Sequence, residues 1–230
     1  MRVNNIFYSL QGEGRNTGRA AVFIRFAGCN LRCSFCDTEF ESYREMNNEE
    51  VMAEVEALSP QPSAIKPLLV LTGGEPTLQV DEAFVDFLHQ HGYEVAMESN
   101  GTRPAPQNLD WLTVSPKQKP VHQRCGEVKV VFTDAEHVSD FELEADYYYL
   151  QPCDTGDPER NKAITQACVE YIKQHPKWRL SLQTHKLIDI EYISNLQSPT
   201  SKLNPYVLAQ HHTPHLSDYR GSNDYSCSPG

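Results

Sequence analysis

The sequence predicts an α/β fold: a partial, incomplete TIM-like barrel of about six mainly parallel strands with few helices. Three observations predict it. Short apolar runs alternate with amphipathic helical segments over residues 20–183, an order typical of parallel strands joined by right-handed crossovers. About six such runs are too few for a closed eight-stranded barrel. Several of the connections are also too short to hold a full helix.

The composition is that of one globular domain. The chain has 230 residues, of which 39% are hydrophobic and 22% are charged, enough for a single core. Its formal net charge of −11 is a poor match for a phosphate backbone, so we expect no direct nucleic-acid partner. No apolar run is long enough to cross a bilayer, and the N-terminal residues lack the apolar core of a signal peptide. We therefore expect a cytoplasmic protein without a membrane partner.

The N-terminal part is predicted to hold a hairpin, a buried strand and a helix. Residues 6–18 are rich in glycine and favour a loop or hairpin. Residues 20–27 are apolar except for Arg25, which predicts a buried strand. Asn47 and Glu50 have the spacing of a capping box, so a helix should begin there.

Strands and helices alternate in the following part of the chain. Residues 83–88 favour an amphipathic helix that ends near Gly92, and residues 158–174 favour a longer helix capped by Asp157. The remaining apolar runs predict strands at residues 68–72, 94–98, 111–114, 128–132, 147–150 and 179–183. Loops at the carboxyl ends of parallel strands usually carry the functional residues, so we expect the site there.

The C-terminal residues break this pattern. We assign residues 1–190 to the barrel domain and residues 191–230 to a polar tail, which is rich in Ser, Pro, Asn, Tyr and His and has no periodicity. We expect this tail to be poorly ordered or to dock without its own core; a foreign or frameshifted segment is a further interpretation. Residues 210–215 include three histidines, for which solvation is a simpler interpretation than metal binding.

Three of the seven cysteines, Cys29, Cys33 and Cys36, have the spacing C-x3-C-x2-C. Three thiolates can bind one face of a cubane iron–sulfur cluster, whereas a cluster that only carries electrons usually has four cysteine ligands. The iron without a protein ligand can chelate the amino and carboxylate groups of an amino acid, such as the methionine part of S-adenosylmethionine (SAM). We therefore predict a [4Fe-4S] cluster that makes SAM generate a radical.

A structural zinc site is the alternative for these cysteines. Zinc usually takes four ligands, commonly in two pairs, and the next cysteine, Cys125, is distant and has no partner at ligand spacing. The cluster is therefore the favoured interpretation. The other cysteines outside the triplet, Cys153, Cys168 and Cys227, are expected to be ordinary thiols like Cys125, as buried free cysteines often are.

The triplet, with Phe35 before its last cysteine, resembles the signature of the radical SAM superfamily. The sequence Thr72-Gly73-Gly74-Glu75-Pro76, at the end of a predicted strand, is similar to the glycine-rich motif of that superfamily. Glycines let the backbone approach a ligand, and a carbonyl or carboxylate can receive the methionine ammonium group. Either motif alone is weak, but both occur here in the order and at the distance that the superfamily has.

Further segments resemble one family of that superfamily, the 7-carboxy-7-deazaguanine synthases. These segments are residues 7–14, 23–25, 36–38, 98–102, 114–117, 151–152 and 182–186. The resemblance implies conversion of 6-carboxy-5,6,7,8-tetrahydropterin to 7-carboxy-7-deazaguanine with loss of ammonia, a step toward queuosine and other 7-deazapurines. It also implies that hydrogen is first removed from C6 of the pterin and later returned, so that SAM acts catalytically.

For the substrate, the resemblance implies contacts from several strands. Arg25 would bind the substrate carboxylate in bidentate fashion, and Glu13 would accept from the guanidine-like face. Thr38 would ligate Mg²⁺ beside that carboxylate, although the sequence alone equally permits a capping threonine. The other implied substrate-binding residues are Leu10, Gln11, Gly12, Thr72 and His185.

For SAM, the resemblance implies that Gly74 and Glu75 bind the methionine end, beside Phe35. Glu98 and Asn100 are secondary candidates, for which solvation of a loop is the alternative. The ribose and carboxylate would be bound by Ser115, Pro116 and Lys117, and the adenosine would lie along Gln151, Pro152, Cys153 and Asp154.

The resemblance also implies a homodimer and a reducing partner such as flavodoxin. Family members usually end soon after the segment that matches residues 182–186, and their terminus can reach the substrate pocket. Here about forty residues follow, so we do not expect the Gly230 carboxylate to take that part. Two other functions stay open at this point: an activase that installs a glycyl radical on a protein, and a non-catalytic zinc- or cluster-binding module.

Overall fold

The computed structural model describes residues 1–60 and 65–190. The predicted tail, residues 191–230, and its histidines lie outside the described residues, so the domain boundary at residue 190 stays a prediction. The described residues belong to one compact unit, Met1–Ser194. None of the helices in these ranges has the length and apolar character that crossing a membrane requires.

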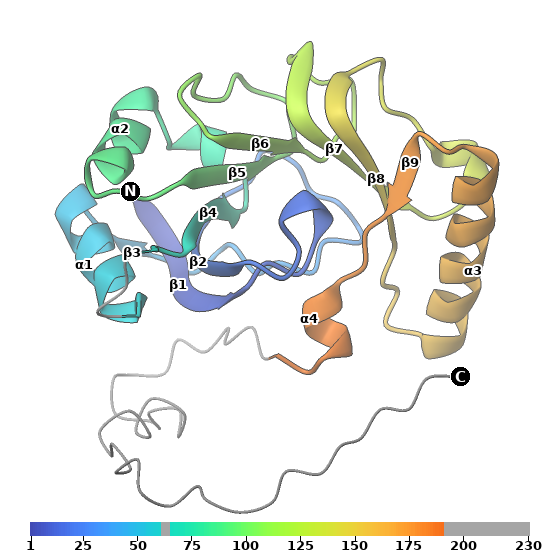
Figure 1. Cartoon of the computed structure of the whole chain (residues 1–230), viewed down its shortest axis with the longest axis horizontal. Helices are drawn as coiled ribbons and strands as arrows, with labels where there is room; N and C mark the ends of the chain where they lie inside the picture. The colour runs from blue at the N-terminus through green and yellow to red at the C-terminus, as the bar shows by residue number, and fades with distance from the viewer. Residues whose placement is uncertain (61–64, 191–230) are drawn as a thin grey trace, which may run out of the picture. The chain divides into compact units, whose positions relative to one another are not determined.

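The described part of the chain is built on one nine-stranded sheet with the order β3-β1-β2-β4-β5-β6-β7-β8-β9 (Figure 1). Strands β2 and β4 to β9 run parallel to one another, while β1 pairs antiparallel with both β2 and β3 at one edge. The sheet does not close, because β3 and β9 are its two ends. The prediction of a partial barrel with mainly parallel strands is therefore confirmed. The strands are β1 Arg2–Leu10, β2 Ala20–Phe26, β3 Arg44–Glu45, β4 Leu68–Gly73, β5 Val95–Ser99, β6 Trp111–Val114, β7 Arg124–Phe132, β8 Glu144–Pro152 and β9 Trp178–Leu180.

Few helices accompany the sheet, as predicted. They are α1 Asn48–Leu58, α2 Glu82–Gln90, α3 Pro158–Gln174 and α4 Thr184–Leu187, with short 3-10 turns η1 Gly14–Asn16, η2 Pro76–Leu78 and η3 Ala135–His137. The capping box of α1 is confirmed, because Asn47 and Glu50 each accept from the other's backbone N–H, at 2.9 and 2.8 Å. The Asp157 side chain caps α3 as predicted.

One prediction near the N-terminus was only partly right. Residues 6–18 include the second half of a long strand, β1, which forms a hairpin with β2 (Leu10 pairs with Ala20). The hairpin is confirmed, but a loop over residues 6–10 is wrong. The strand was hidden because its burial does not alternate regularly and its register shifts between Val3 and Asn5. The helix α4 was not predicted, since its four residues are too short to show a period.

The buried apolar residues form two clusters on the face of the sheet that carries the helices and a smaller cluster on the inner face. One large cluster joins β2, β4 and β5 to α1 and α2, and another joins β7 and β8 to α3. In β2, Val22 and Ile24 belong to the first of these, whereas Phe23 packs on the opposite, inner face against Phe7, with ring centroids 4.9 Å apart. Both faces of β2 are thus buried, which explains its continuous apolar sequence. Arg25 follows Phe23 on the inner face and brings a charge to the end of that strand.

Candidate functional site

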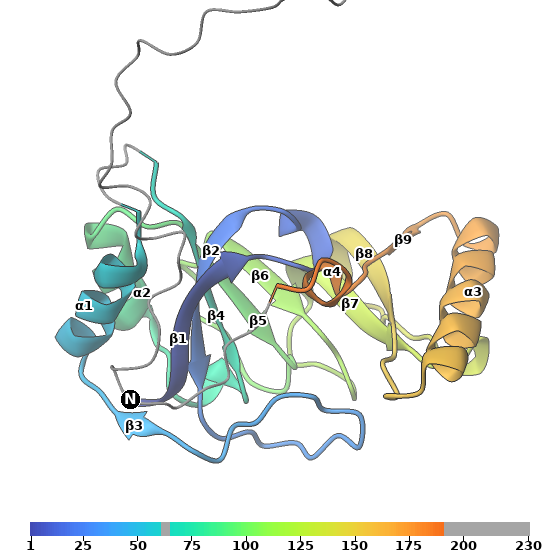
Figure 2. The same ribbon diagram turned by 90° about the horizontal axis from the view of Figure 1, so that it is seen from below.

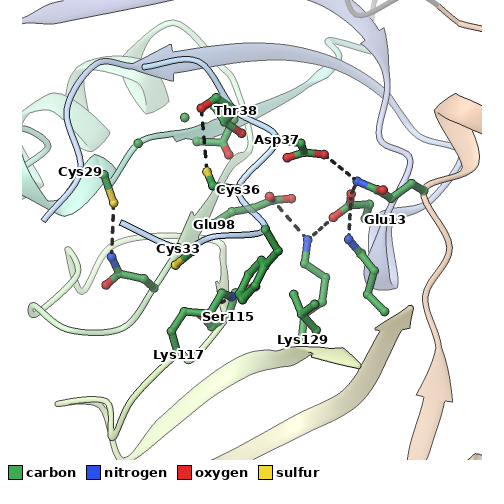
Figure 3. A pocket seen from close by; sticks show the side chains of 18 of the residues that line it. Glu13, Cys29, Cys33, Cys36, Asp37, Thr38, Glu98, Ser115, Lys117 and Lys129 are labelled. Atoms are coloured by element: carbon green, nitrogen blue, oxygen red, sulfur yellow. Dashed lines mark hydrogen bonds and ion pairs between the residues drawn. The ribbon is translucent and has the colours of Figure 1, made fainter. Parts of the chain in front are cut away.

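A cavity of about 260 Å³ lies where β2 and β4 to β8 end (Figure 3). Its wall includes the last residues of β4, β5 and β8 and the loop that follows β6. The expectation that the site would lie at the carboxyl ends of the strands therefore agrees with the position of this pocket. All but four of the predicted site residues line it; the exceptions are Leu10, Gly12, Glu75 and Pro116.

The three cysteines lie on the long loop that connects β2 to β3. Figure 3 shows Cys29, Cys33 and Cys36 on the same side of the pocket. All three thiols are free; Cys29 and Cys33 are half-buried and Cys36 is exposed. The backbone N–H of Cys36 donates to the carbonyl of Cys33 at 3.2 Å, which makes the tight turn that brings these two thiols to one wall.

The donor set fits a cluster with three protein ligands. Cys29 Sγ accepts from the backbone N–H of Leu31 at 3.4 Å and faces Asn100 Nδ2 at 3.9 Å, and such donors stabilise a cluster thiolate. Burial raises the pKa of the Cys33 thiol, and the nearby Lys117 ammonium opposes that shift. Among residues 1–60 and 65–190, no three His, Cys, Asp or Glu side chains converge around a single metal position.

The glycine-rich motif holds the start of the cysteine loop through backbone contacts. The N–H of Gly74 donates to Phe26 O at 2.9 Å, and the N–H of Glu75 donates to Gly28 O at 2.8 Å. Gly73 has a φ of 111°, which favours glycine. A Cβ atom on Gly74 would overlap the Gly28 carbonyl and lie 3.2 Å from Cys29 N. The two sequence motifs are therefore one packed unit.

Glu75 does not reach the pocket. Its side chain is fully buried, and Oε1 accepts from Thr77 N at 3.1 Å, Thr77 Oγ1 at 2.6 Å and Ser99 Oγ at 2.8 Å. Its other oxygen, Oε2, accepts from Asn100 N at 2.7 Å. This carboxylate positions Asn100 beside Cys29, and of the Gly-Gly-Glu part of the motif only Gly73 and Gly74 line the cavity.

We expect Glu75→Gln to lower the free energy of unfolding by about 1–3 kcal/mol. The two backbone donors, Thr77 N–H and Asn100 N–H, lie on different carboxylate oxygens, so either orientation of the amide would turn an NH₂ group toward one of them. Urea denaturation measures the effect. Glu54→Gln, which weakens an exposed ion pair with Arg44, is the matched control and should cost less than about 1 kcal/mol. Equal stability of Glu75→Gln and the unchanged protein would contradict this account.

The predicted substrate anchors lie on adjacent strands. Arg25 on β2 pairs in register with Thr72 on β4, so both side chains lie on the pocket wall. The Arg25 guanidinium lies over the Phe7 ring, 4.9 Å from its centroid, which keeps the charged group on the inner face. Next to them, Thr38 also lines the cavity.

His185 of helix α4 lines the pocket, and α4 lies beside the connection between β1 and β2 (Figure 2). Thr184 N donates to Gly12 O at 3.1 Å, and a Cβ on Gly12 would overlap the imidazole of the buried His185. Gly12 thus permits α4 to pack rather than lining the cavity itself. Burial lowers the pKa of His185, and the Glu13 carboxylate opposes that shift.

Lys129, a buried lysine on β7, was not predicted from the sequence to be a site residue. Its Nζ contacts Glu13 Oε2 and lies 3.6 Å from Glu98 Oε2, with its side chain only 7% exposed. One signal in the sequence was available: Lys129 is the single charged residue in the predicted strand 128–132, on the same side as Val131, which also lines the pocket. The other lining residues that were not predicted are Phe23, Leu31, Asp37, Gly73, Ser99 and Gln183.

Burial and neighbouring charges shift the pKa values of several side chains in and behind the pocket. Burial alone would raise the pKa of Glu13, but the Lys129 ammonium and hydrogen bonds outweigh it and lower that pKa. Behind them on β7, burial raises the pKa of Glu127 to about 7. Burial also lowers the pKa of Lys117, and the charge of Lys129 adds to that shift. The result is a pocket that presents an anionic wall at Glu13 and a cationic one at Arg25.

The chain is similar to known proteins over most of its length. The radical SAM superfamily matches residues 23–175. A 7-carboxy-7-deazaguanine synthase from Bacteroides thetaiotaomicron is 52% identical over 192 residues, which cover 82% of this chain and 98% of that protein. The enzyme of the same name from Burkholderia multivorans is 40% identical over 209 residues, with the same two shares covered. The crystal structure of QueE from Escherichia coli has a TM-score of 0.62 and 27% identity, covering 80% of this chain and 94% of that one.

Proposed function

The chain belongs to the 7-carboxy-7-deazaguanine synthase family of radical SAM enzymes, and from this premise we propose how its pocket performs the reaction. The enzyme converts 6-carboxy-5,6,7,8-tetrahydropterin to 7-carboxy-7-deazaguanine with loss of ammonia, in the biosynthesis of queuosine. The observation that carries the proposal is one pocket lined by the three cluster cysteines, Arg25 and Glu13. Family membership leaves no support for the glycyl-radical activase or for the non-catalytic module.

The chain supplies the protein ligands for the family's cofactors. When bound, a [4Fe-4S] cluster on Cys29, Cys33 and Cys36 and its SAM supply a 5′-deoxyadenosyl radical. The Gly73–Gly74 backbone forms the wall beside Cys29 and suits the methionine end of SAM. Lys117 Nζ donates to the Ser115 carbonyl at 3.0 Å and lies 5.7 Å from the Phe35 ring centroid, so these three residues form a second wall. The residues proposed along the adenosine are Gln151, Pro152, Cys153 and Asp154.

On the substrate side, each charged residue matches one end of the pterin. Arg25 provides a fork of N–H donors for the carboxylate. Glu13 provides acceptor oxygens for the amino and ring N–H groups of the opposite end. Glu13 Oε1 already accepts from Gln151 at 3.3 Å and from Gln183 at 3.2 Å, so its position is set before the substrate arrives. This preformed geometry lowers the cost of ordering the site on binding.

Thr38 and Mg²⁺ are the least usual part of the proposal. Thr38 follows Cys36 and Asp37 and lines the same cavity as Arg25, which supports the proposal that its hydroxyl shares a cation with the substrate carboxylate. Mg²⁺ takes oxygen ligands and keeps several waters, which suits a site with one protein hydroxyl.

We expect Thr38→Val to remove the stimulation of turnover by Mg²⁺ and to lower turnover about 10- to 100-fold. The effect should be no larger than that of losing an outer contact of a metal, because waters and substrate oxygens would supply the other ligands of the ion. The isosteric valine keeps the shape of the loop while it removes the only proposed protein ligand. Initial rates are measured over a series of Mg²⁺ concentrations. Thr165→Val on α3, whose hydroxyl donates to Asn161 O at 2.8 Å, is the control. An unchanged Mg²⁺ response of Thr38→Val would remove Thr38 from the metal site.

The proposed function is tested by anaerobic turnover. The reduced, cluster-loaded enzyme is given SAM and the carboxytetrahydropterin, with and without Mg²⁺, and 7-carboxy-7-deazaguanine and ammonia are quantified. We expect both products in equal amounts and about four iron atoms per chain. Cleavage of SAM without formation of a deazapurine would contradict the proposed substrate.

We also propose a homodimer, a flavodoxin-type reducing partner and a cytoplasmic location. Family membership supports the first two proposals. The reducing partner is also required by the chemistry, because the cluster must receive an electron from outside the chain. The net charge of −11 supports a small-molecule substrate and no direct nucleic-acid partner. Sedimentation of the full chain tests the dimer, and electron transfer from reduced flavodoxin tests the partner.

A further inference from the structure

Lys129 lies between two carboxylates that face the pocket from different elements. Glu13 comes from the loop after β1, and Glu98 comes from the end of β5. The Lys129 ammonium contacts Glu13 Oε2 and is 3.6 Å from Glu98 Oε2, as the dashed lines in Figure 3 show. The second oxygen of Glu98 accepts from Gln11 Nε2 at 2.9 Å, and Gln11 Oε1 accepts from Glu13 N at 3.1 Å. Lys129 therefore links the two carboxylates directly, and Gln11 links the Glu98 carboxylate to the backbone of Glu13.

We propose that Lys129 is a positioning residue of the substrate site, which keeps Glu13 and Glu98 side by side as two ionised acceptors for the N–H groups of an aminopyrimidine ring. The identity of that ring as part of a pterin rests on the proposed function. The inference adds to it a residue that determines specificity, and it assigns Glu98 to the substrate rather than to SAM.

The charges around Lys129 explain why a cation is needed. Glu13, Glu98 and the buried Glu127 all face it, and the other titratable groups near this wall include Lys117, His185, Arg25 and Asp37. Without the ammonium group, three carboxylates would share one poorly solvated region, and at least one would bind a proton. A protonated carboxyl presents an O–H donor toward the ring N–H groups in place of an acceptor.

Lys129 itself stays protonated. Burial alone would lower the pKa of Lys129, but Glu13 and Glu98 outweigh burial and raise it above its ordinary value. An ammonium group that keeps its proton does not serve as a base. Its contribution is to fix the charge and the direction of its two neighbours, so its loss should change binding selectivity before it changes the chemistry.

The experiment compares two ligands on the cluster-loaded enzyme. One is 6-carboxypterin, and the other is 6-carboxylumazine, which carries a 2-oxo group in place of the 2-amino group. Affinities are measured by calorimetry for the unchanged protein and for Lys129→Met, Lys129→Arg and the control Lys66→Met. Lys66 is half-buried and donates to a backbone carbonyl, His91 O, but it lies outside the pocket lining.

We expect Lys129→Met to weaken carboxypterin binding about 10- to 100-fold, the size of lost charge-assisted hydrogen bonds, and to change lumazine binding less than about threefold. In this variant, carboxypterin affinity should rise with pH between about pH 6 and 8, because the shared proton leaves the carboxylates. The unchanged protein, Lys129→Arg and Lys66→Met should keep their selectivity. Their affinity should change less over that range than that of Lys129→Met, because Glu13 stays ionised beside the cation while only the neighbouring Glu127, with a pKa of about 7, titrates.

A double variant tests whether repulsion between the two carboxylates causes the pH response of Lys129→Met. Lys129→Met with Glu98→Gln removes one charge of each sign and with it the repulsion between Glu98 and Glu13, so the pH response should be smaller than in Lys129→Met. Unchanged selectivity in Lys129→Met, or a pH response in the double variant as large as in Lys129→Met, would overturn the inference.

If the unchanged protein binds neither ligand, the proposed substrate is wrong, and ¹³C NMR titration of the glutamate carboxyls in the ligand-free protein decides about Lys129. The inference requires one additional protonated carboxyl at neutral pH in Lys129→Met. The same spectrum in both proteins would refute it.

Discussion

Replacing Cys33 with alanine is expected to abolish both cluster assembly and turnover. Cys33 is the middle ligand of the triplet. It lies on the loop that follows β2, the strand of Arg25, and that also carries Thr38. Two remaining thiols leave two irons without a protein ligand, whereas a radical-generating cluster leaves one. Loss of an outer partner of a metal site already costs about 10- to 100-fold, so loss of a direct ligand should cost more than 100-fold.

Iron and sulfide content, the visible absorption of the cluster and reductive cleavage of SAM measure this loss separately from turnover. Cys168→Ala is the matched control. Cys168 lies on α3 and is fully buried against the sheet. Burial raises the pKa of its thiol to about 12, so the thiol stays neutral in the core. This control should lose some stability and keep its iron. An active Cys33→Ala protein without a cluster would refute the mechanism.

The parts of the fold that the sequence predicted are those with local signals. The capping box at Asn47 and Glu50 and the buried run of β2 act within a few residues, and both are present in the structure. Strand β1 was missed because its partner, β2, decides its conformation, and its shifted register conceals the alternation. Likewise, four residues of α4 become a helix only where the β1–β2 connection supports them.

The site shows the same division between local and tertiary information. The cysteine triplet and the glycine-rich motif could be predicted from the sequence, because the residues of each motif lie within one short segment. Glu75 was assigned to the pocket because its motif faces SAM in the resemblance, yet its carboxylate is fully used by Thr77, Ser99 and Asn100. Lys129 was overlooked because only the pairing of β7 with its neighbours shows that Glu13 and Glu98 surround it. A lysine in an apolar strand is the type of signal that should prompt a search for buried carboxylates.

Gly74→Ala is expected to have the second large effect, because it pushes the cysteine loop away from the sheet. The added methyl group would overlap the Gly28 carbonyl oxygen and lie 2.5 Å from Gly28 C. That carbonyl cannot turn aside without losing the hydrogen bond from Glu75 N. Overpacking of this kind costs about 1–3 kcal/mol. We therefore expect a lower free energy of unfolding together with poor retention of iron.

The comparison with Gly92→Ala separates strain from displacement of the loop. Gly92 has a φ of 77° but open space around a Cβ, so its substitution costs about 1–2 kcal/mol through backbone strain alone. Urea denaturation should therefore show a loss of stability in both variants, whereas anaerobic iron analysis should show loss of the cluster only in Gly74→Ala. Full iron content in Gly74→Ala would mean that Gly28 and Cys29 can move without harm. In that case, the contact between the two motifs would be a consequence of the fold and not a requirement for placing the first cluster ligand.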